Sequence, residues 1–122
     1  MRKILVVEDE PTLRDAYEMI LSTEPYIINV AENGEEALQL CKSTDYDLIL
    51  LDIMMPKVDG VMFLQRFPQL KRPQPKIIIM SNLSAGEEVA QALELGAVKN
   101  ILKANLSPKQ LLSLVRYELQ AN

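Results

Sequence analysis

The 122-residue sequence lacks the cysteines that stabilise small domains through disulfide bonds. It contains one cysteine, Cys41, so it cannot form an internal disulfide. It is neither glycine-rich nor proline-rich, and we find no repeat, linker or low-complexity segment in it. A composition of 48% hydrophobic and 25% charged residues is typical of a globular chain that buries its own core. We therefore expect one domain over residues 1–122, with Cys41 packed as a small hydrophobic residue on the apolar side of a helix.

No run of arginine and lysine stands out in the sequence, and its formal net charge is -4. The densest basic group is Lys71, Arg72 and Lys76, which Pro73 and Pro75 interrupt. Proteins that hold nucleic acid neutralise its phosphates with clustered basic side chains. We expect no direct nucleic-acid binding by this chain.

A long hydrophobic run is also missing. The apolar stretch near the N-terminus ends at Glu8, and it is too short for a signal peptide or a membrane span. We expect a cytoplasmic chain that does not associate with a membrane.

Five short apolar segments recur at fairly even spacing, at residues 4–7, 27–30, 48–51, 77–80 and 98–102. Most of them are continuous rather than alternating, as in strands that helices cover on both faces. Segments with a helical period lie between them, and the clearest of these has one apolar face made of Leu13, Ala16, Tyr17, Ile20 and Leu21. Five alternations of strand and helix predict an α/β fold. We expect an open, doubly wound, flavodoxin-like sheet of five parallel strands in the order 2-1-3-4-5, with five helices.

Polar or charged residues follow four of the five predicted strands. Glu8 and Asp9 follow the first strand, Asp52 the third, Ser81 the fourth and Lys103 the fifth. In open α/β sheets, ligands bind beyond the carboxyl ends of the strands, where the strand order reverses. The predicted order makes these four strands neighbours, so we expect their terminal side chains to converge.

The combination of residue types indicates a particular chemistry. Three carboxylates held close together raise one another's pKa, and a hard divalent cation such as Mg²⁺ removes that cost. A lysine and a hydroxyl beside them provide the cation and the hydrogen-bond donor that a phosphoryl group needs. The pattern therefore predicts a phosphoryl-transfer site, with Asp52 as the nucleophile that forms an aspartyl-phosphate.

With these residues, the sequence resembles the receiver domain of bacterial two-component response regulators. The resemblance covers the whole chain, residues 1–122. The matching motifs are residues 4–10, residues 47–56 with Asp59 and Gly60, and then Ser81, Gly96, Ala97 and Lys103. The stretch from Asp52 through Pro56 to Gly60 is the most specific part of this match.

The resemblance implies a role for each residue of the predicted site. Asp52 would accept a phosphoryl group from a sensor histidine kinase or a phosphotransfer protein, and Ser81 and Lys103 would bind the phosphoryl oxygens. Asp59 with Gly60 would shape the turn into the third helix, as the turn chemistry of these residues also suggests.

The resemblance also implies a Mg²⁺ ion at this site. Asp9 and Asp52 would ligate the ion directly, and Glu8 would act mainly through water. Met54 would offer its backbone carbonyl.

A signalling domain rather than an enzyme is implied, with at most slow self-catalysed phosphorylation and dephosphorylation. Phosphorylation would switch the surface formed by the fourth helix, the fifth strand and the fifth helix. That surface would act on a downstream protein target or a fused output domain. Receivers often dimerise through the same region, so a homodimer is a further expectation.

Two positions depart from the family pattern. Asn100 stands where many receivers have Tyr or Phe, three residues before the lysine, so we expect the output surface to respond through the loop after Ser81 instead. Ala104 follows Lys103 where proline in a cis peptide is usual. A cis bond to a non-proline residue costs roughly 2.5–4 kcal/mol, so we predict a trans peptide there.

Two apolar residues, Met54 and Leu83, occupy the positions that influence phosphate lifetime in the family. They flank the expected path of the hydrolytic water. We predict that they exclude water and give a comparatively long-lived phosphoryl group.

Three other functions share parts of this pattern. A Mg²⁺-dependent phosphatase would have a second aspartate two residues after its nucleophile, where this chain has Met54. A flavodoxin-like FMN carrier would have a Ser/Thr/Gly-rich loop after the first strand, where Glu8 and Asp9 would instead repel the FMN phosphate. A degenerate receiver, acting as a phosphorylation-independent protein-binding module, stays open because of Asn100 and Ala104.

Overall fold

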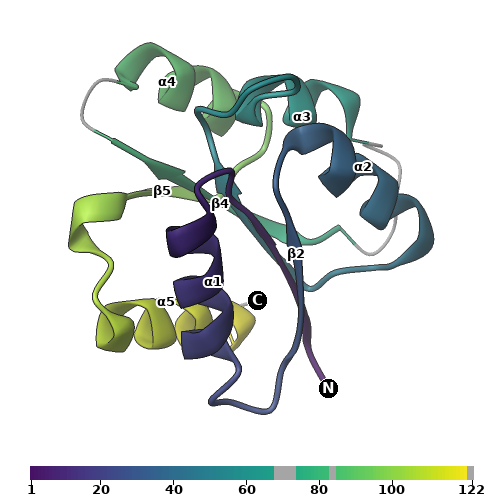
Figure 1. Cartoon of the computed structure of the whole chain (residues 1–122). Coiled ribbons are helices and arrows are strands. Elements are labelled where there is room, and N and C mark those ends of the chain that lie inside the picture. Colours follow the sequence, from purple (N-terminus) through teal and green to yellow (C-terminus); the bar gives the residue numbers. More distant parts are fainter. Residues whose placement is uncertain (68–73, 83–84, 121–122) are drawn as a thin grey trace.

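A single sheet of five parallel strands forms the centre of the computed structural model, which describes residues 1–67, 74–82 and 85–120 (Figure 1). The strand order is β2-β1-β3-β4-β5, so the predicted 2-1-3-4-5 topology is confirmed. The strands are β1 (Lys3–Val7), β2 (Ile27–Ala31), β3 (Leu48–Asp52), β4 (Lys76–Ser81) and β5 (Lys99–Leu102). Each begins and ends within two residues of its predicted apolar segment.

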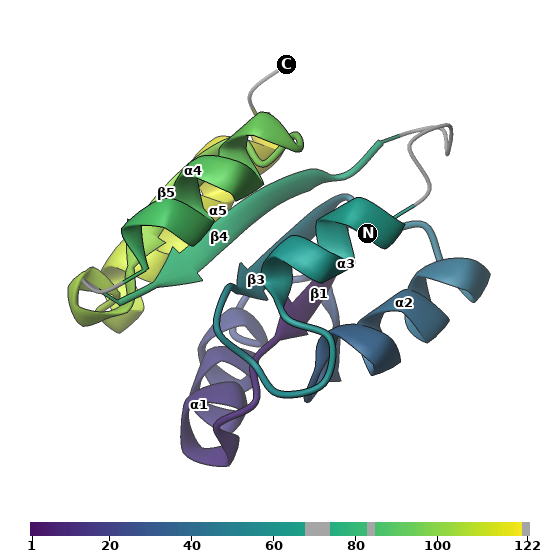
Figure 2. The ribbon, with the colours of Figure 1, turned by 90° about the horizontal axis from the view of Figure 1, so that it is seen from above.

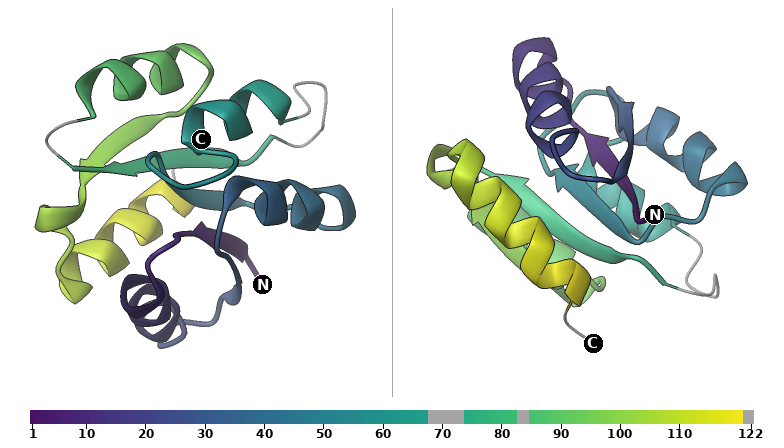
Figure 3. Two further views of the ribbon diagram at one scale, coloured as in Figure 1. Left: turned by 45° about the horizontal axis from the view of Figure 1, so that its top comes forward. Right: turned by 90° about the horizontal axis from the view of Figure 1, so that it is seen from below.

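The helices cover both faces of this sheet. They are α1 (Pro11–Leu21), α2 (Gly34–Ser43), α3 (Gly60–Arg66), α4 (Gly86–Glu94) and α5 (Pro108–Gln120), and a short 3₁₀ turn, η1 (Lys103–Asn105), precedes α5. Helices α2, α3 and α4 lie on one face, seen from above in Figure 2, whereas α1 and α5 lie on the other, seen from below in Figure 3. Within the described ranges, no helix combines the length and apolar character that crossing a membrane requires.

The two helical layers explain why the strands are apolar on both sides. Residues such as Leu5, Ile49 and Ile79 point to the layer of α2, α3 and α4. Their neighbours in sequence, such as Leu50 and Met80, point to the layer of α1 and α5. All five residues of the central strand β3 are buried. Burial of apolar surface on both faces is the main favourable contribution to the stability of such a sheet.

The single cysteine is part of this core. Cys41 lies on α2, is 3% exposed and packs in the same cluster as Leu5 and Ile49. The predicted packing position on the apolar side of a helix is confirmed.

Local interactions at the helix starts fix the loops beyond the carboxyl ends of the strands. Helix α1 begins at Pro11, and the Glu10 carboxylate accepts hydrogen bonds from the amides of Thr12 and Leu13 at 3.1 and 2.8 Å. A side-chain acceptor at this position satisfies amides that have no partner inside the helix. The turn after β1 is therefore held tightly against α1.

The turn into α3 depends on Asp59 and Gly60, as predicted. The Asp59 side chain caps the helix by accepting a hydrogen bond from the Met62 amide at 2.9 Å. A Cβ atom on Gly60 would lie 2.7 Å from the Cα of Ile53, so only glycine allows this close approach. The loop that leaves β3 at Asp52 is thereby anchored at its far end.

Candidate functional site

The polar residues predicted at the strand ends lie at one edge of the sheet. Asp52 is the last residue of β3 and Ser81 is the last residue of β4. Glu8 and Asp9 directly follow β1, and Lys103 directly follows β5. Four of these side chains are brought together, and the fifth, Ser81, makes a separate contact described below.

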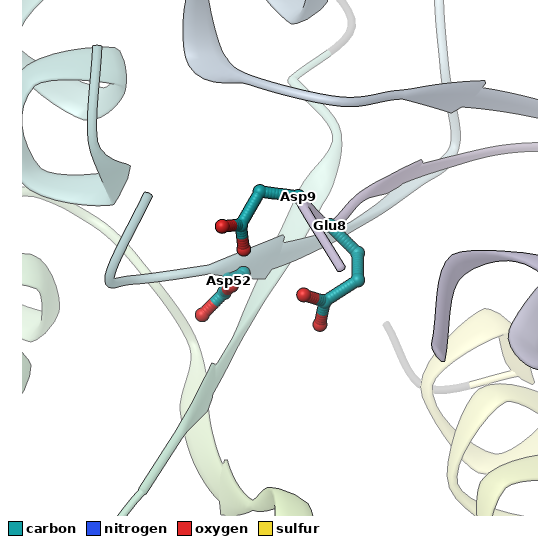
Figure 4. A group of neighbouring side chains, drawn as sticks. All are labelled: Glu8, Asp9 and Asp52. Atoms are coloured by element: carbon teal, nitrogen blue, oxygen red, sulfur yellow. The ribbon is translucent and has the colours of Figure 1, made fainter. Parts of the chain in front are cut away.

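Three carboxylates form the acidic part of the site. One oxygen from each of Glu8, Asp9 and Asp52 can be chosen so that all three atoms lie within 4.8 Å of one another. Figure 4 shows the three side chains, two from the turn after β1 and one from the end of β3. Glu8 and Asp52 are 0% and 1% exposed, whereas Asp9 is open to solvent. The predicted convergence of the acids is confirmed.

One lysine lies among these acids. The Lys103 ammonium is 2.9 Å from Glu8 Oε1 and 3.0 Å from Asp52 Oδ2. A single ammonium is thus shared by two buried carboxylates. Burying two carboxylates beside one cation is costly, so the pair retains capacity for a further cation.

The environment shifts the protonation of Asp52 and Lys103. The pKa of Asp52 is raised to about 7, first by burial and then by the charge of Glu8, while Lys103 opposes the rise. Burial acts to lower the pKa of Lys103, but the carboxylates of Glu8 and Asp52 outweigh that effect and raise it. Lys103 is therefore a fixed cation at neutral pH, whereas Asp52 is divided between its neutral and charged forms.

Backbone groups hold the carboxylates in place. The amide of Met54 donates to Asp52 Oδ1 at 3.2 Å, and the amide of Glu10 donates to Glu8 Oε2 at 3.1 Å. The Met54 side chain, two residues beyond Asp52, is 49% exposed. The predicted role of the Met54 carbonyl as a metal ligand stays a prediction, and Leu83, which was expected to act with Met54, lies outside the described residues.

Arg14 is a contributor that the sequence did not reveal. From α1, its guanidinium donates to the backbone carbonyl of Glu8 at 3.1 Å and to that of Asp9 at 3.5 Å. These contacts fix the acidic turn and place a positive charge behind it. Only its place in the first turns of α1, directly after the acidic pair, hints at this role in the sequence.

Ser81 contacts the neighbouring strand β5 through its side chain. Its hydroxyl donates a hydrogen bond of 2.7 Å to the Oδ1 atom of Asn100 on β5. Asn100 was singled out in the sequence only as a position that lacks an aromatic ring, and its bond to Ser81 was not predicted.

The donor set fits a hard divalent cation. Glu8, Asp9 and Asp52 offer oxygen atoms only, and the two buried acids, Glu8 and Asp52, share a single ammonium. Mg²⁺ prefers oxygen ligands and usually keeps several waters, which the open side of Asp9 allows. The same edge of the sheet therefore carries three acids that could hold a cation, together with a fixed ammonium, and Ser81 ends the neighbouring strand β4.

Comparison with known proteins agrees with this arrangement. The family model described as the response regulator receiver domain matches residues 4–116. The chain is 39% identical over 116 residues to the transcriptional regulatory protein ResD of Bacillus subtilis, covering 93% of this chain and 46% of that protein. It is 36% identical over 108 residues to a protein-glutamate methylesterase/protein-glutamine glutaminase of Thiobacillus denitrificans, covering 86% of this chain and 30% of that protein.

A solved structure shows the same fold. The CheY-like receiver domain protein of Methanospirillum hungatei superposes with a TM-score of 0.88 at 28% sequence identity, covering 98% of this chain and 94% of that one. The chain spans less than half the length of the two curated relatives named above. The strand order, the acidic edge and these matches lead to one conclusion: the chain belongs to the receiver domain family of response regulators.

Proposed function

We propose that Asp52 accepts a phosphoryl group from the phosphohistidine of a sensor histidine kinase or of a phosphotransfer protein, in a Mg²⁺-dependent reaction. The observation that carries this proposal is the buried Asp52 carboxylate among two further acids and one ammonium. A carboxylate with an elevated pKa is a more basic nucleophile, and nearby cations can stabilise the phosphoryl group that it gains.

The transfer itself has a simple balance. An Asp52 carboxylate oxygen forms a bond to phosphorus while the phosphorus–nitrogen bond of the donor breaks, and the released imidazole takes a proton from solvent. Asp52 must be deprotonated to attack, and Lys103 at 3.0 Å favours that charged form. Lys103 would then neutralise part of the charge on the phosphoryl oxygens, with Ser81 as a hydrogen-bond donor.

Glu8, Asp9 and Asp52, with the Met54 carbonyl, are the residues that would hold Mg²⁺. The ion would supply positive charge to the phosphoryl oxygens. The three carboxylate oxygens within 4.8 Å of one another, two of them from buried residues, support this assignment.

Signalling rather than turnover is the proposed outcome. Met54 offers no acid for repeated hydrolysis, and its partly exposed side chain beside the site would slow the approach of water. The phosphorylated chain would act on a protein target or on an output domain in the cytoplasm, through α4, β5 and α5, and a homodimer through the same elements is part of the proposal. The names of the longer relatives, a transcriptional regulator and a methylesterase, illustrate how widely outputs differ.

The proposal is tested by intact mass after incubation with phosphoramidate, with Mg²⁺ or with EDTA. We expect one phosphoryl adduct with Mg²⁺, and no adduct with EDTA or on the Asp52→Asn variant. Asp15→Asn, which changes an exposed carboxylate on α1, is the matched control and should keep the adduct. A folded wild-type chain that takes no adduct would instead favour the phosphorylation-independent binding module.

A further inference from the structure

The hydrogen bond between Ser81 and Asn100 joins two neighbouring strands just below the acidic site. The hydroxyl oxygen of Ser81 lies 2.7 Å from Asn100 Oδ1, and Ser81 is 1% exposed. In the β4–β5 register Ser81 pairs with Leu102, so Asn100 lies two residues further from the site on β5. The Ser81 hydroxyl is therefore held toward the sheet interior, along β5, by a side-chain acceptor.

A serine hydroxyl has a single proton to donate. While that proton is donated to Asn100, it cannot be donated to an oxygen of a phosphoryl group on Asp52. Ser81 is 1% exposed, so its hydroxyl has little access to bulk water as an alternative acceptor. The two acceptors exclude one another, and the free energy of the Ser81–Asn100 bond is a cost of engaging the phosphoryl group.

We propose that Asn100 is a positioning residue that holds the Ser81 hydroxyl in the unphosphorylated chain and competes with the phosphoryl group for its proton. This inference rests on the proposed phosphorylation of Asp52. It assigns a chemical function to the position where the family resemblance implied only the loss of an aromatic ring. Asn100 can act here because its carboxamide oxygen is an acceptor, which a phenylalanine ring would not supply.

The Ser81–Asn100 hydrogen bond could also transmit the effect of phosphorylation to the surface of the chain. Asn100 lies on the edge strand β5, which is half-buried along its length. When Ser81 turns to the phosphoryl group, the Asn100 carboxamide loses its donor and must find another partner. Strand β5 also lines an open hollow beside α5, together with Asn105, Leu106, Gln110 and Leu114. Phosphorylation would thus alter hydrogen bonding on a strand that contributes to this hollow.

The test uses fluoroberyllate with Mg²⁺ as a stable phosphoryl probe on the full chain. The Asn100→Leu variant keeps a similar side-chain volume and removes the acceptor. Because one partly buried neutral hydrogen bond no longer has to be broken, we expect the dissociation constant of the probe to fall about threefold to tenfold. Asn100→Ala should tighten binding in the same direction, and it replaces the first variant if thermal unfolding shows that Asn100→Leu is not folded.

A matched control lies on the opposite edge strand. Tyr46 donates a hydrogen bond of the same 2.7 Å length to Asn29 Oδ1 on β2. Asn29→Leu removes this bond and should leave probe affinity within twofold of wild type. An equal tightening in this control would overturn the proposal, because it would mean that any lost strand-edge bond has the same effect.

A double-mutant cycle separates positioning from a structural role. In the Ser81→Ala background the contested proton is gone, so Asn100→Leu should no longer change the dissociation constant. Tightening that persists without the hydroxyl, or unchanged affinity of Asn100→Leu and Asn100→Ala in the wild-type background, would overturn the inference while leaving Asp52 phosphorylation in place. If the wild-type chain binds no probe and forms no phosphoryl adduct, the proposed function fails, and this inference fails with it.

Discussion

Buried carboxylates occur at both edges of the sheet, but the number of cations that neutralise their charge differs between the edges. At the carboxyl edge, Glu8 and Asp52 share the single ammonium of Lys103, with Asp9 close by. At the amino edge, the buried Glu118 of α5 contacts two lysines at the starts of β4 and β5. Lys99 is at 2.8 Å and Lys76 is at 4.0 Å, and the Lys76 ammonium also donates to the Glu118 carbonyl at 2.8 Å.

This difference distinguishes a candidate functional site from a group of ion pairs with a structural role. At the amino edge, two lysines contact one buried carboxylate, and the group fastens the last helix to two strands. At the carboxyl edge, one ammonium is shared by two buried carboxylates and a third acid lies close by, so negative charge is in excess there. A protein normally avoids such an excess, and an added cation would relieve it. Binding of Mg²⁺ would therefore relieve repulsion between carboxylates at the acidic edge, and no such repulsion is present among the described residues around Glu118 at the amino edge.

Removing one lysine from each edge should show this difference most strongly. Lys103→Gln leaves Glu8 and Asp52 without their shared cation, so we expect the free energy of unfolding at pH 8 to fall by about 3 kcal/mol. Lys99→Gln leaves Lys76 beside Glu118, and because Lys99 is partly exposed we expect a loss below about 1 kcal/mol. Urea unfolding in EDTA measures both values, and equal losses would contradict the comparison.

Replacing the amino-edge carboxylate of Glu118 by an amide should have the next largest effect on the free energy of unfolding. Glu118→Gln removes the anion that two lysines contact and leaves the helix end less firmly attached. We expect the free energy of unfolding to fall by about 2 kcal/mol, which is less than for a fully buried ion pair because both lysines reach solvent. Glu94→Gln, an exposed change on α4, is the control and should stay within about 0.5 kcal/mol of wild type. An unchanged free energy of unfolding for Glu118→Gln would contradict a structural role for this residue.

Adding Mg²⁺ should stabilise the wild-type chain. At a free concentration ten times its dissociation constant, an ion that binds only the folded state raises the free energy of unfolding by about 1.4 kcal/mol. Thermal unfolding with increasing Mg²⁺ measures this rise. Asp9→Asn should reduce the response and Asp15→Asn should preserve it, whereas an unresponsive wild-type chain would argue against the cation site.

The metal-free chain should gain stability when Asp52 is replaced by asparagine, with a defined pH dependence. The folded pKa of Asp52 is raised from 3.8 to about 7, so the unfolded chain loses this proton at a lower pH than the folded chain does. Below pH 4 the Asp52 side chain is protonated in both states and leaves the free energy of unfolding unchanged. Between pH 4 and pH 7 its charge lowers that free energy progressively, and above pH 7 the loss is complete.

We expect Asp52→Asn in EDTA to be about 1 kcal/mol more stable than wild type at pH 8, with this advantage shrinking toward pH 4. Urea unfolding at several pH values gives the comparison. An advantage that grows on acidification would have the wrong sign and would contradict the electrostatic account of the acidic edge.

The fold and the acidic edge could be predicted from the sequence because both depend on local patterns. Continuous apolar segments indicated buried parallel strands, and the polar residue after each segment indicated the carboxyl edge. Contacts between side chains far apart in the sequence could not be read in this way. Glu118 looks like any helix-surface glutamate until α5 docks beside Lys76 and Lys99.

The hydroxyl of Ser81 shows the same limit inside the site. Its place at the end of a strand was predicted, but its partner depends on the β4–β5 register and on the rotamer of Asn100. The contact of Arg14 with the acidic turn likewise depends on how α1 leaves β1. Sequence pattern therefore identified which residues reach the edge, whereas their hydrogen-bond partners required the structure.

The central claim, that Asp52 is the phosphoryl acceptor, is tested most directly by chemical trapping. Borohydride reduces an aspartyl-phosphate to homoserine, and peptide mass mapping then locates the modified position. After incubation with phosphoramidate and Mg²⁺, the account predicts homoserine at position 52 alone, and none when EDTA replaces Mg²⁺. Homoserine at another carboxylate, or its absence from a folded chain incubated with donor and Mg²⁺, would contradict the account.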